Sequence, residues 1–469
     1  MVMVLALTGQ LFQARAQTES FLYSFGGLPD GAKPRANLIQ ATDGNFYGTT
    51  YAGGTNSHGC VFRVTSGGSE TVLYSFGNQP FDGANSSAPL VQGGDGYLYG
   101  TTTEGGTNGF GTVFRISLTG SYSNLYSFQG PPNDGQSPAV GLTRGNDGNF
   151  YGATQGGGAG GFGTVFRFTP GGTETMLYSF AGPPGDGYQP LAGLVLGSDG
   201  NFYGTTFFGG ITNVPSVGFV DMLGLGTVFR ISPGGNYQLL YLFGSTVPDG
   251  FAPGQLVQAG DGNFYGVAFE GGTFTNRGAV FRITPGGSES LFYSFGSQPG
   301  DGSNPSSLII GSDGNFYGTT TKGGANDIGA VFRIGPGGSE TVPYSFGSQP
   351  NDGNEPLGGL VQANGGNFYG TTLNGGAGNG TIFDLTVPVV IPTNQITAIK
   401  INPGVNIVLT IFSVANKTYQ LQISPSLSPP AWSDVAGASI TSSNGGPVTL
   451  TNSTGTLGLH GYFRVSISP

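Results

Sequence analysis

The chain contains few charged residues, and six of its basic residues occupy one position of a repeated sequence unit. Asp, Glu, Lys and Arg make up only 9% of the 469 residues, and the formal net charge is −10. Eleven of the 15 basic residues are Arg, and six of these recur at one repeated position. No basic patch remains that could follow a phosphate backbone, so the composition excludes nucleic acid as a partner. For the same reason it argues against binding to an anionic membrane surface.

Residues used in many active sites are also scarce. The single cysteine, Cys60, excludes an intrachain disulfide and a cysteine-based zinc site. The two histidines, His58 and His460, lie far apart in the sequence, so no Ser-His-Asp set or histidine-rich metal spacing is present. The many Gly-x-Gly strings lack the following helix that a dinucleotide or phosphate site requires. We therefore expect no enzyme activity, no cofactor and no metal.

Long apolar runs are missing as well. No stretch approaches the roughly 18 apolar residues of a membrane-spanning helix. A short apolar run does open the chain and ends in Ala14-Arg15-Ala16, which resembles a secretory leader with its cleavage site. The basic residues that usually precede such a run are absent, so an inert leader is the alternative. We expect residues 1–16 to direct export and the protein to be secreted or held in the cell envelope.

What the chain has in abundance is a repeat. The stretch Asp43-Gly44-Asn45-Phe46-Tyr47-Gly48-Thr49-Thr50 returns, with small changes, in seven units. Its tyrosine is Tyr47, Tyr99, Tyr151, Tyr203, Tyr265, Tyr317 and Tyr369. The spacing is 52 residues except for one step of 62. A fixed period of this length, filled with strand-like segments, indicates a propeller or another repeat array.

Each unit contains four expected strands, which we name a to d. Strand a holds the leucines Leu38, Leu90, Leu142, Leu194, Leu256, Leu308 and Leu360, and strand b holds the repeated tyrosine. Strand c holds Phe62, Phe114, Phe166, Phe229, Phe281, Phe332 and Phe383. Strand d ends at Phe25, Phe76, Phe128, Phe180, Phe243, Phe295 and Phe346. Four strands in each repeat of about this length are typical of a β-propeller blade, so we predict an all-β, seven-bladed propeller over residues 17–386.

The phase of the repeat predicts how the ring closes. The chain begins with a lone strand d over residues 19–25, and the last unit stops after strand c at residues 380–385. We expect the N-terminal strand to complete the seventh blade, which would remove the exposed edges of an open array.

The connections fall into two classes that should lie on opposite faces. The a–b and c–d turns are short and rich in Asp, Asn, Gly and Pro, which suit tight turns. The d–a and b–c loops are longer and more variable. Since neighbouring strands alternate in direction, all the long loops share one face. Repeat four adds about ten residues there, between Gly210 and Gly226, either as a contact surface or as an insertion that folds back on its own blade.

Beyond the repeats the pattern changes. Residues 387–395 read as a semi-rigid linker that contains two prolines. Residues 396–469 show alternating apolar strands and predict a small C-terminal β domain that resembles a sandwich.

The order of elements within each unit, for example Asp313–Thr320 followed by Gly329–Phe346, resembles the GloVer repeat of the choice-of-anchor tandem-repeat proteins. The resemblance covers about residues 19–385. It implies a bacterial secreted or surface protein and, in many members, a C-terminal anchor. The tail Tyr462–Pro469 lacks the hydrophobic helix and basic residues of such an anchor. The family assigns no catalytic residues.

Two rings of aspartate accompany the repeat. The first, in the a–b turn, is Asp43, Asp95, Asp147, Asp199, Asp261 and Asp313. The second, in the d–a loop, is Asp30, Asp82, Asp134, Asp186, Asp249, Asp301 and Asp352. Carboxylate rings can bind Ca²⁺, but each Asp precedes Gly, which favours a turn role. We also expect the strand-c arginines to pair with the glutamates Glu70, Glu174, Glu289 and Glu340 early in strand d.

A function should break the sevenfold symmetry. The position five residues after the repeated tyrosine differs in nearly every unit and lies on the loop-rich face: Ala52, Glu104, Gly156, Phe208, Glu270, Lys322 and Asn374. We predict that Glu104, Phe208, Glu270, Lys322 and Asn374, with Asp221 of the insertion, contact a ligand. Glu104 and Glu270 lie almost across the ring, too far apart for a glycosidase pair unless loops fold inward. A surface ion pair of Glu270 with Lys322 is the structural alternative.

These features favour a non-enzymatic, monomeric module that binds a glycan or a surface protein through its loop-rich face. A structural envelope protein is one alternative. An extracellular polysaccharide hydrolase or lyase that uses carboxylates on the same face is another.

Overall fold

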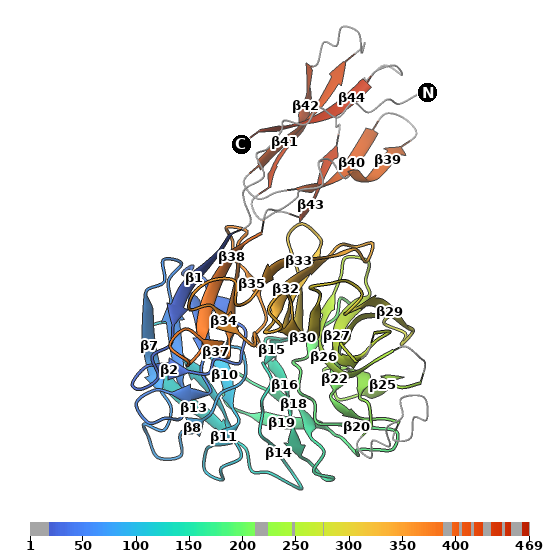
Figure 1. Ribbon diagram of the computed structural model, residues 1–469. Coiled ribbons are helices and arrows are strands. Elements are labelled where there is room, and N and C mark those ends of the chain that lie inside the picture. Colours follow the sequence, from blue (N-terminus) through green and yellow to red (C-terminus); the bar gives the residue numbers. More distant parts are fainter. Residues whose placement is uncertain are drawn as a thin grey trace.

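The computed structural model describes residues 18–211, 224–245, 249–274 and 276–387, followed by six strands between residues 396 and 468. Every named element in these stretches is a β-strand (Figure 1). No helix among the described residues is both long and apolar enough to cross a membrane.

Seven four-stranded antiparallel sheets form the blades of a propeller, each with the strand order a-b-c-d. Blades 1 and 2 are β3 (Ile39–Gln40), β4 (Phe46–Thr49), β6 (Cys60–Val64), β7 (Glu70–Ser75), and β9 (Val91–Gln92), β10 (Leu98–Thr102), β12 (Thr112–Ile116), β13 (Tyr122–Ser127). Blades 3 and 4 are β15 (Thr143–Arg144), β16 (Phe150–Thr154), β18 (Thr164–Phe168), β19 (Glu174–Ser179), and β21 (Val195–Leu196), β22 (Phe202–Thr206), β24 (Thr227–Ile231), β25 (Tyr237–Leu242). Blades 5 and 6 are β26 (Gly250–Gln258), β27 (Phe264–Gly271), β28 (Ala279–Ile283), β29 (Glu289–Ser294), and β30 (Gly302–Ile310), β31 (Phe316–Gly323), β32 (Ala330–Ile334), β33 (Glu340–Ser345).

Blade 7 joins the two ends of the repeat region, and this confirms the predicted closure. It consists of β35 (Val361–Gln362), β36 (Phe368–Thr372), β38 (Thr381–Thr386) and the N-terminal β1 (Thr18–Ser24). Strand β1 pairs antiparallel with β38, with Phe21 opposite Phe383 (Figure 1, blue beside orange). The outer edge of β38 is thereby covered, as closure of the ring requires.

The repeated Phe-Tyr pair of strand b holds neighbouring blades together. Successive residues of a strand point to opposite faces, so each blade offers Tyr to one neighbour and Phe to the other. Tyr151 stacks on Phe202 with ring centroids 4.0 Å apart, and Tyr369 stacks on Phe46 at 4.1 Å across the closing interface. The same pairing joins Tyr99 to Phe150, Tyr203 to Phe264, Tyr265 to Phe316 and Tyr317 to Phe368. Blade 2 has Leu98 in place of Phe, so only the interface of blades 1 and 2 lacks this stack.

A glycine follows the tyrosine because the strand-c phenylalanine of the same blade lies across it. In blade 5, a Cβ on Gly266 would lie 2.5 Å from Phe281 Cζ and 2.7 Å from Leu256 Cδ2. Phe281 is completely buried and makes an edge-to-face contact with Phe243, the residue that follows strand d of the preceding blade, at 5.1 Å. Equivalent contacts occur at every blade interface, so each hydrophobic cluster spans two blades.

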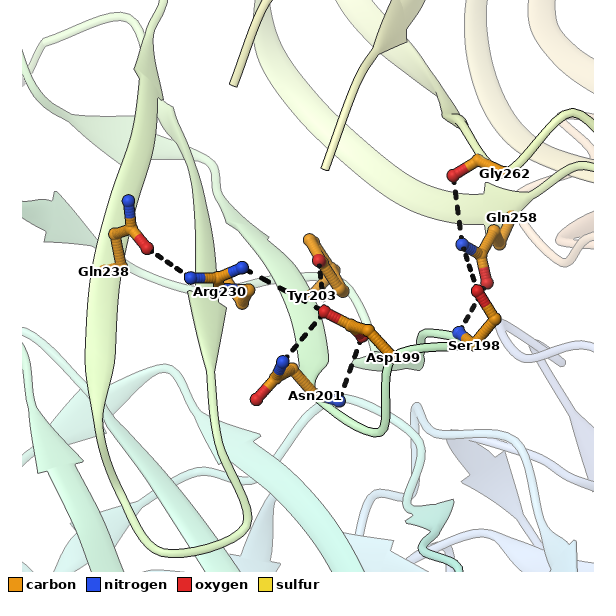
Figure 2. Close-up of polar contacts among 8 residues, drawn as sticks. All are labelled: Ser198, Asp199, Asn201, Tyr203, Arg230, Gln238, Gln258 and Gly262. Carbon is orange, nitrogen blue, oxygen red and sulfur yellow. Dashed lines mark hydrogen bonds and ion pairs between the residues drawn. The ribbon is translucent and has the colours of Figure 1, made fainter. Parts of the chain in front are cut away.

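The first aspartate ring builds the a–b turns, as its Asp-Gly signal predicted. Asp199 accepts hydrogen bonds from the backbone N–H of Asn201 at 3.1 Å, from Asn201 Nδ2 at 2.8 Å and from the Tyr203 hydroxyl at 2.9 Å (Figure 2). Gln258 of the next blade accepts the Ser198 N–H at 2.8 Å, which ties the two turns together (Figure 2). These carboxylates therefore stabilise turns.

The predicted pairing of strand-c arginines with strand-d glutamates is wrong. Arg63 lies opposite Thr71, whereas Glu70 lies opposite Val64. Since side chains alternate between the two faces of a sheet, Arg63 and Glu70 point to opposite sides of the blade. Two arginines instead approach the a–b turns, with Arg230 Nη1 4.0 Å from Asp199 Oδ2 and Arg282 Nε 3.9 Å from Asp261 Oδ2.

The strand-d glutamates face the second aspartate ring. Asp30 accepts the Tyr23 hydroxyl at 2.9 Å and the N–H groups of Gly26 and Gly31. Burial, with the nearby Asp30 charge, raises the pKa of Glu70 to about 7. The same causes raise the pKa of Glu289 to about 7 and those of Glu174 and Glu340 to about 8.

The residue that replaces this glutamate in blade 4 shows that the position lies within reach of the second aspartate ring. Tyr237 occupies the same position, and its hydroxyl donates to Asp186 Oδ1 at 2.9 Å. A hydroxyl facing the aspartate is thus compatible with the fold. For the glutamates at this position in other blades, burial and the aspartate charge raise the pKa and so favour the protonated form.

The chain beyond the propeller contains two three-stranded antiparallel sheets. One has the order β39 (Ile396–Asn402), β40 (Asn406–Ser413), β43 (Gly446–Thr451), and the other β42 (Ser433–Ser442), β41 (Lys417–Ser424), β44 (Tyr462–Ser468). The C-terminal region is thus β-rich, while its sandwich arrangement stays a prediction. The expected leader, residues 1–16, and residues 388–395 of the expected linker lie outside the described residues.

Candidate ligand-binding site on the loop-rich face

Short two-stranded ribbons extend the a–b hairpins toward the loop-rich face, a feature that we did not expect from the sequence. In five blades they are separate: β2 (Gly31–Ala32) with β5 (Ala52–Gly53), β8 (Gly83–Ala84) with β11 (Glu104–Gly105), β14 (Gly135–Gln136) with β17 (Gly156–Gly157), β20 (Gly187–Tyr188) with β23 (Phe208–Gly209), and β34 (Gly353–Asn354) with β37 (Asn374–Gly375). In blades 5 and 6 they are the ends of β26 and β27 and of β30 and β31.

Each ribbon places the variable position opposite a second variable residue. We call these the ribbon pairs: Ala32–Ala52, Ala84–Glu104, Gln136–Gly156, Tyr188–Phe208, Phe251–Glu270, Ser303–Lys322 and Asn354–Asn374. Next to each pair, a glycine lies opposite a glycine in every blade. The ring therefore presents seven different side-chain pairs from one backbone arrangement.

The backbone beside the ribbon pairs is held the same way in each blade. The residue that follows the first member of each ribbon pair has a left-handed φ between 52° and 58°: Lys33, Asn85, Ser137, Gln189, Ala252, Asn304 and Glu355. Its N–H donates to a b–c loop carbonyl of the preceding blade, as Asn85 does to His58 at 2.8 Å. Such a conformation is uncommon for residues other than glycine and persists where surrounding contacts define it.

Asn374, one of the predicted ligand contacts, is engaged at the closing interface. Its Nδ2 donates to Glu355 Oε2 at 2.8 Å, and Lys33 Nζ donates to its Oδ1. The Lys33 bond links blade 7 to the loop that enters blade 1, while the Glu355 bond lies within blade 7. The structure thus gives Asn374 partners within the protein.

Phe208 belongs to an aromatic cluster where blades 3 and 4 meet. Its ring centroid lies 4.9 Å from that of Phe207 and 5.9 Å from that of Tyr188, which contacts Phe162 at 5.3 Å. All four rings are half-buried. Asp221, from the insertion that follows in the chain, lies outside the described residues.

Glu270 and Lys322 do not form the ion pair that we considered. The described part of the chain contains two ion pairs, and neither involves these residues. Each faces a partner across its own ribbon, half-buried Glu270 opposite Phe251 and exposed Lys322 opposite Ser303. Adjacent blades therefore do not bring the two charges together.

Glu104 lines a pocket of about 360 Å³ between blades 1 and 2. The pocket is also lined by His58, Gln79 and Phe81, and its remaining wall is mostly glycine together with Ala84. Glu104, Gln79, Phe81 and His58 are exposed. Of the six residues predicted as ligand contacts, Glu104 is the one found in this pocket.

The second carboxylate of the pocket, Asp82, is already engaged. It accepts the Tyr74 hydroxyl at 2.6 Å, the Asn78 N–H at 3.1 Å and the Gly83 N–H at 2.8 Å. Asp82 is therefore part of the loop, and Glu104 is the carboxylate that a ligand can reach. No group of three or more His, Cys, Asp or Glu among the described residues is placed to hold a metal ion.

Phe81 and Asn124 were not among the residues predicted from the sequence. Both occupy positions where other repeats have a different kind of residue, glycine, asparagine or proline at the first and an apolar residue at the second. Asn124 Nδ2 donates to the Phe81 carbonyl at 3.1 Å. A comparison of repeats at every position, in place of one, would have found them.

Seven four-stranded blades, closed by pairing of the first strand with the last, define a β-propeller. Within this class, the chain belongs to the Gloeobacter/Verrucomicrobia repeat family, whose model matches residues 6–217 and 221–400. This confirms the resemblance found in the repeat sequence. Among curated proteins no match was found.

Solved structures resemble this one only distantly. The extracellular domain of a putative one-component system from B. thetaiotaomicron is 13% identical with a TM-score of 0.48, and the match covers 95% of this chain and 58% of that one. A polysaccharide lyase described as an ulvan lyase is 9% identical with a TM-score of 0.48, covering 80% and 99%. PorZ, a surface component of the type-IX secretion system of Porphyromonas gingivalis, is 13% identical with a TM-score of 0.38, covering 90% and 62%. Likenesses at these TM-scores support no inference about function.

Proposed function

We propose that this protein is a secreted or cell-surface propeller that binds an extracellular ligand, a glycan or a surface protein, through its loop-rich face. The ribbon pairs carry this proposal. They stand on one repeated backbone, yet their side chains range from Ala32–Ala52 to Tyr188–Phe208 and Ser303–Lys322. Loops held by a rigid scaffold are where binding residues concentrate in many folds.

Packing does not account for this variation. At the blade interfaces the repeated Tyr and Phe residues are preserved because each fits a buried neighbour. At the ribbon pairs the side chains are half-buried or exposed in most blades, so many residues fit the same backbone. Residues on such a surface are available to contact a ligand.

The rest of the proposed organisation follows from the sequence. Residues 1–16 direct export, residues 17–386 form the binding module, and residues 387–395 link it to the C-terminal β domain, residues 396–469. The low charge and the lack of a basic patch fit a ligand other than nucleic acid.

Ligand capture by the purified protein tests the proposal. Glu104→Ala, Phe208→Ala, Glu270→Ala and Lys322→Ala are compared on a glycan array and in pull-downs with surface proteins. At least one is expected to weaken binding about tenfold, the effect of losing one well-placed contact. The matched control, Asn364→Ala, changes an exposed residue in an a–b turn on the other face. Equal binding by all variants would refute a loop-face site.

A structural envelope role is the main alternative, and fractionation separates the two. A structural protein should stay in the envelope fraction and be released when residues 396–469 are removed. A ligand-binding module should retain its ligand affinity after the same truncation.

A further inference from the structure

Phe81 stands in a turn that favours a different residue. Three d–a loops share the pattern Gln-Pro-x-Asp-Gly, in which x is Phe81, Gly300 or Asn351. Each turn is closed by a hydrogen bond of 3.3 Å from the Asp N–H to the Gln carbonyl. The φ values at x are 61°, 77° and 63°, respectively. A proline at the second position of the turn and a positive φ at the third match a type II turn, in which the third position prefers glycine or asparagine.

The strain at Phe81 is not offset by burial. A positive φ is unfavourable for a bulky residue, because its Cβ crowds the backbone. The Phe81 side chain is nevertheless 65% exposed, the highest exposure among the large hydrophobic residues described. An exposed aromatic ring on a strained backbone contributes little to folding, which is the situation expected at a binding site.

A second departure from the repeat supports this turn. Asn124 donates from Nδ2 to the Phe81 carbonyl at 3.1 Å and to Ser127 Oγ at 3.3 Å. Its position, two residues before the strand-d tyrosine, is apolar in the other six blades: Phe21, Val72, Met176, Leu239, Leu291 and Val342. Two residues that depart from the repeat therefore meet at one turn, where the Asn124 side chain holds the Phe81 backbone beside the pocket.

The pocket has the size and the groups for a sugar ring. Its volume of about 360 Å³ lies in the range of small-molecule sites. Ala84 faces Glu104 where other blades place Tyr188 or Phe251, so the floor beside the carboxylate is open. Phe81 supplies an apolar face, while Glu104, Gln79 and His58 supply hydrogen-bonding groups around it.

We propose that the pocket between blades 1 and 2 binds a neutral saccharide. This inference rests on the proposed function and assigns its ligand class. The electron-rich face of Phe81 suits the slightly positive C–H groups of a sugar ring, and Glu104 and Gln79 accept its hydroxyl protons. No Lys or Arg is among the described residues that line the pocket, so a uronate or sulfated sugar would meet the Glu104 charge without a counterion.

Phe81→Asn provides the central test, because blade 7 carries asparagine in the same turn. Binding is measured against neutral oligosaccharides of glucose, mannose, galactose and xylose and against galacturonate and sulfated oligosaccharides. The wild type should bind a neutral saccharide, and Phe81→Asn should lose about tenfold or more in affinity. The same variant should melt at an equal or higher temperature than the wild type, because the strain is relieved.

The reverse exchange, Asn351→Phe, is the matched control. It places phenylalanine in the equivalent turn of blade 7, so it should lower the melting temperature and leave saccharide binding unchanged. Glu104→Ala should weaken binding, and Glu104→Gln should restore part of it, since the amide oxygen still accepts a hydroxyl proton.

The outcomes separate this inference from the proposed function. Saccharide binding that survives both Phe81→Asn and Glu104→Ala would overturn the pocket and leave a loop-face binding role in place. Preference for the anionic saccharides, or binding of a protein that depends on Phe81, would overturn the assignment of a neutral saccharide as the ligand. No binding of any probe by the wild type would overturn both proposals.

Discussion

The two faces of the propeller are built from the same repeat and obey different constraints. On the a–b turn face, Asp199 and its counterparts make the same hydrogen bonds to the following asparagine and tyrosine in blade after blade. On the loop-rich face, one backbone arrangement carries a different ribbon pair in almost every blade. Repetition therefore marks residues that make the ring, and variation marks positions that ring formation does not restrict, on the face that we propose binds a ligand.

The difference follows from burial. Tyr203 is completely buried, and its hydroxyl is bound to Asp199, so few replacements would fill the same space and satisfy the same partner. Lys322 is exposed and makes no ion pair among the described residues. A substitution there changes the surface more than the stability.

The largest effect is expected inside a blade interface. Phe281→Ala should destabilise the protein by about 3–5 kcal/mol, because it removes a fully buried ring that contacts Phe243. Urea denaturation followed by far-UV circular dichroism measures the change in the free energy of unfolding. A loss below about 1 kcal/mol would contradict the packing described for the interface.

A glycine-to-alanine substitution in the same blade should have a smaller but clear effect on the free energy of unfolding. Gly266→Ala places a Cβ within 2.5 Å of Phe281 Cζ and should cost about 1–3 kcal/mol. Gly260→Ala in the same blade is the matched control, because its Cβ would meet nothing within 4 Å. Equal unfolding midpoints for the two variants would contradict the close approach of strands b and c.

Stability should also depend on pH, because four strand-d glutamates lie near aspartates of the second ring. Glu70, Glu174, Glu289 and Glu340 have folded pKa values of about 7 to 8 against 4.5 for an ordinary glutamate side chain, so the folded state binds more protons in this window. Their contribution is present below pH 4.5 and is lost as pH rises through about 8. The melting temperature should therefore fall between pH 5 and pH 9.

A double variant checks the origin of that fall. Glu174→Gln with Glu340→Gln removes two of the four groups and should remove roughly half of the pH-dependent loss. Asp43, Asp147, Asp199 and Asp261 have lowered pKa values and titrate below this window. A melting temperature independent of pH in the wild type would show that the glutamates are charged in the folded protein.

The smallest effect is expected on the loop-rich face. Lys322→Ala should change the free energy of unfolding by no more than about 0.5 kcal/mol, because the side chain is exposed and forms no ion pair with any described residue. Thermal melts of this variant and of Gly266→Ala, measured side by side, sharpen the contrast between the faces. A shift as large as that of Gly266→Ala would mean that the ribbon pairs also hold the ring.

Much of the fold was predictable because the same strand and turn signals occur in all seven repeats. The period, the four strands and the displaced phase predicted the blades and the pairing of β1 with β38, all of which the structure confirms. The Arg63–Glu70 pairing failed because composition does not give strand register, and a shift of one residue reverses the face. The ribbons were missed since two-residue pairings leave no hydrophobic alternation in the sequence.

The candidate site was predictable only in part. The variable position led to Glu104, and the structure places it in a pocket. Phe81 lies in the loop that enters blade 2 and Asn124 in the outer strand of that blade, and their contact exists only because the fold brings the d–a loop beside β13. Asn374 looked equally exposed in the sequence, yet its amide is engaged by Glu355 and Lys33.

By itself, the sequence determined that this chain is a closed seven-bladed ring, because local turn signals and apolar strands at a fixed period have few other ways to be buried. The tertiary structure decided which side chains meet across the blades. It decided that strand-d glutamates face aspartates and that one strained phenylalanine borders a pocket with Glu104. Such contacts depend on register and on the spacing between sheets, which no single stretch of the chain encodes.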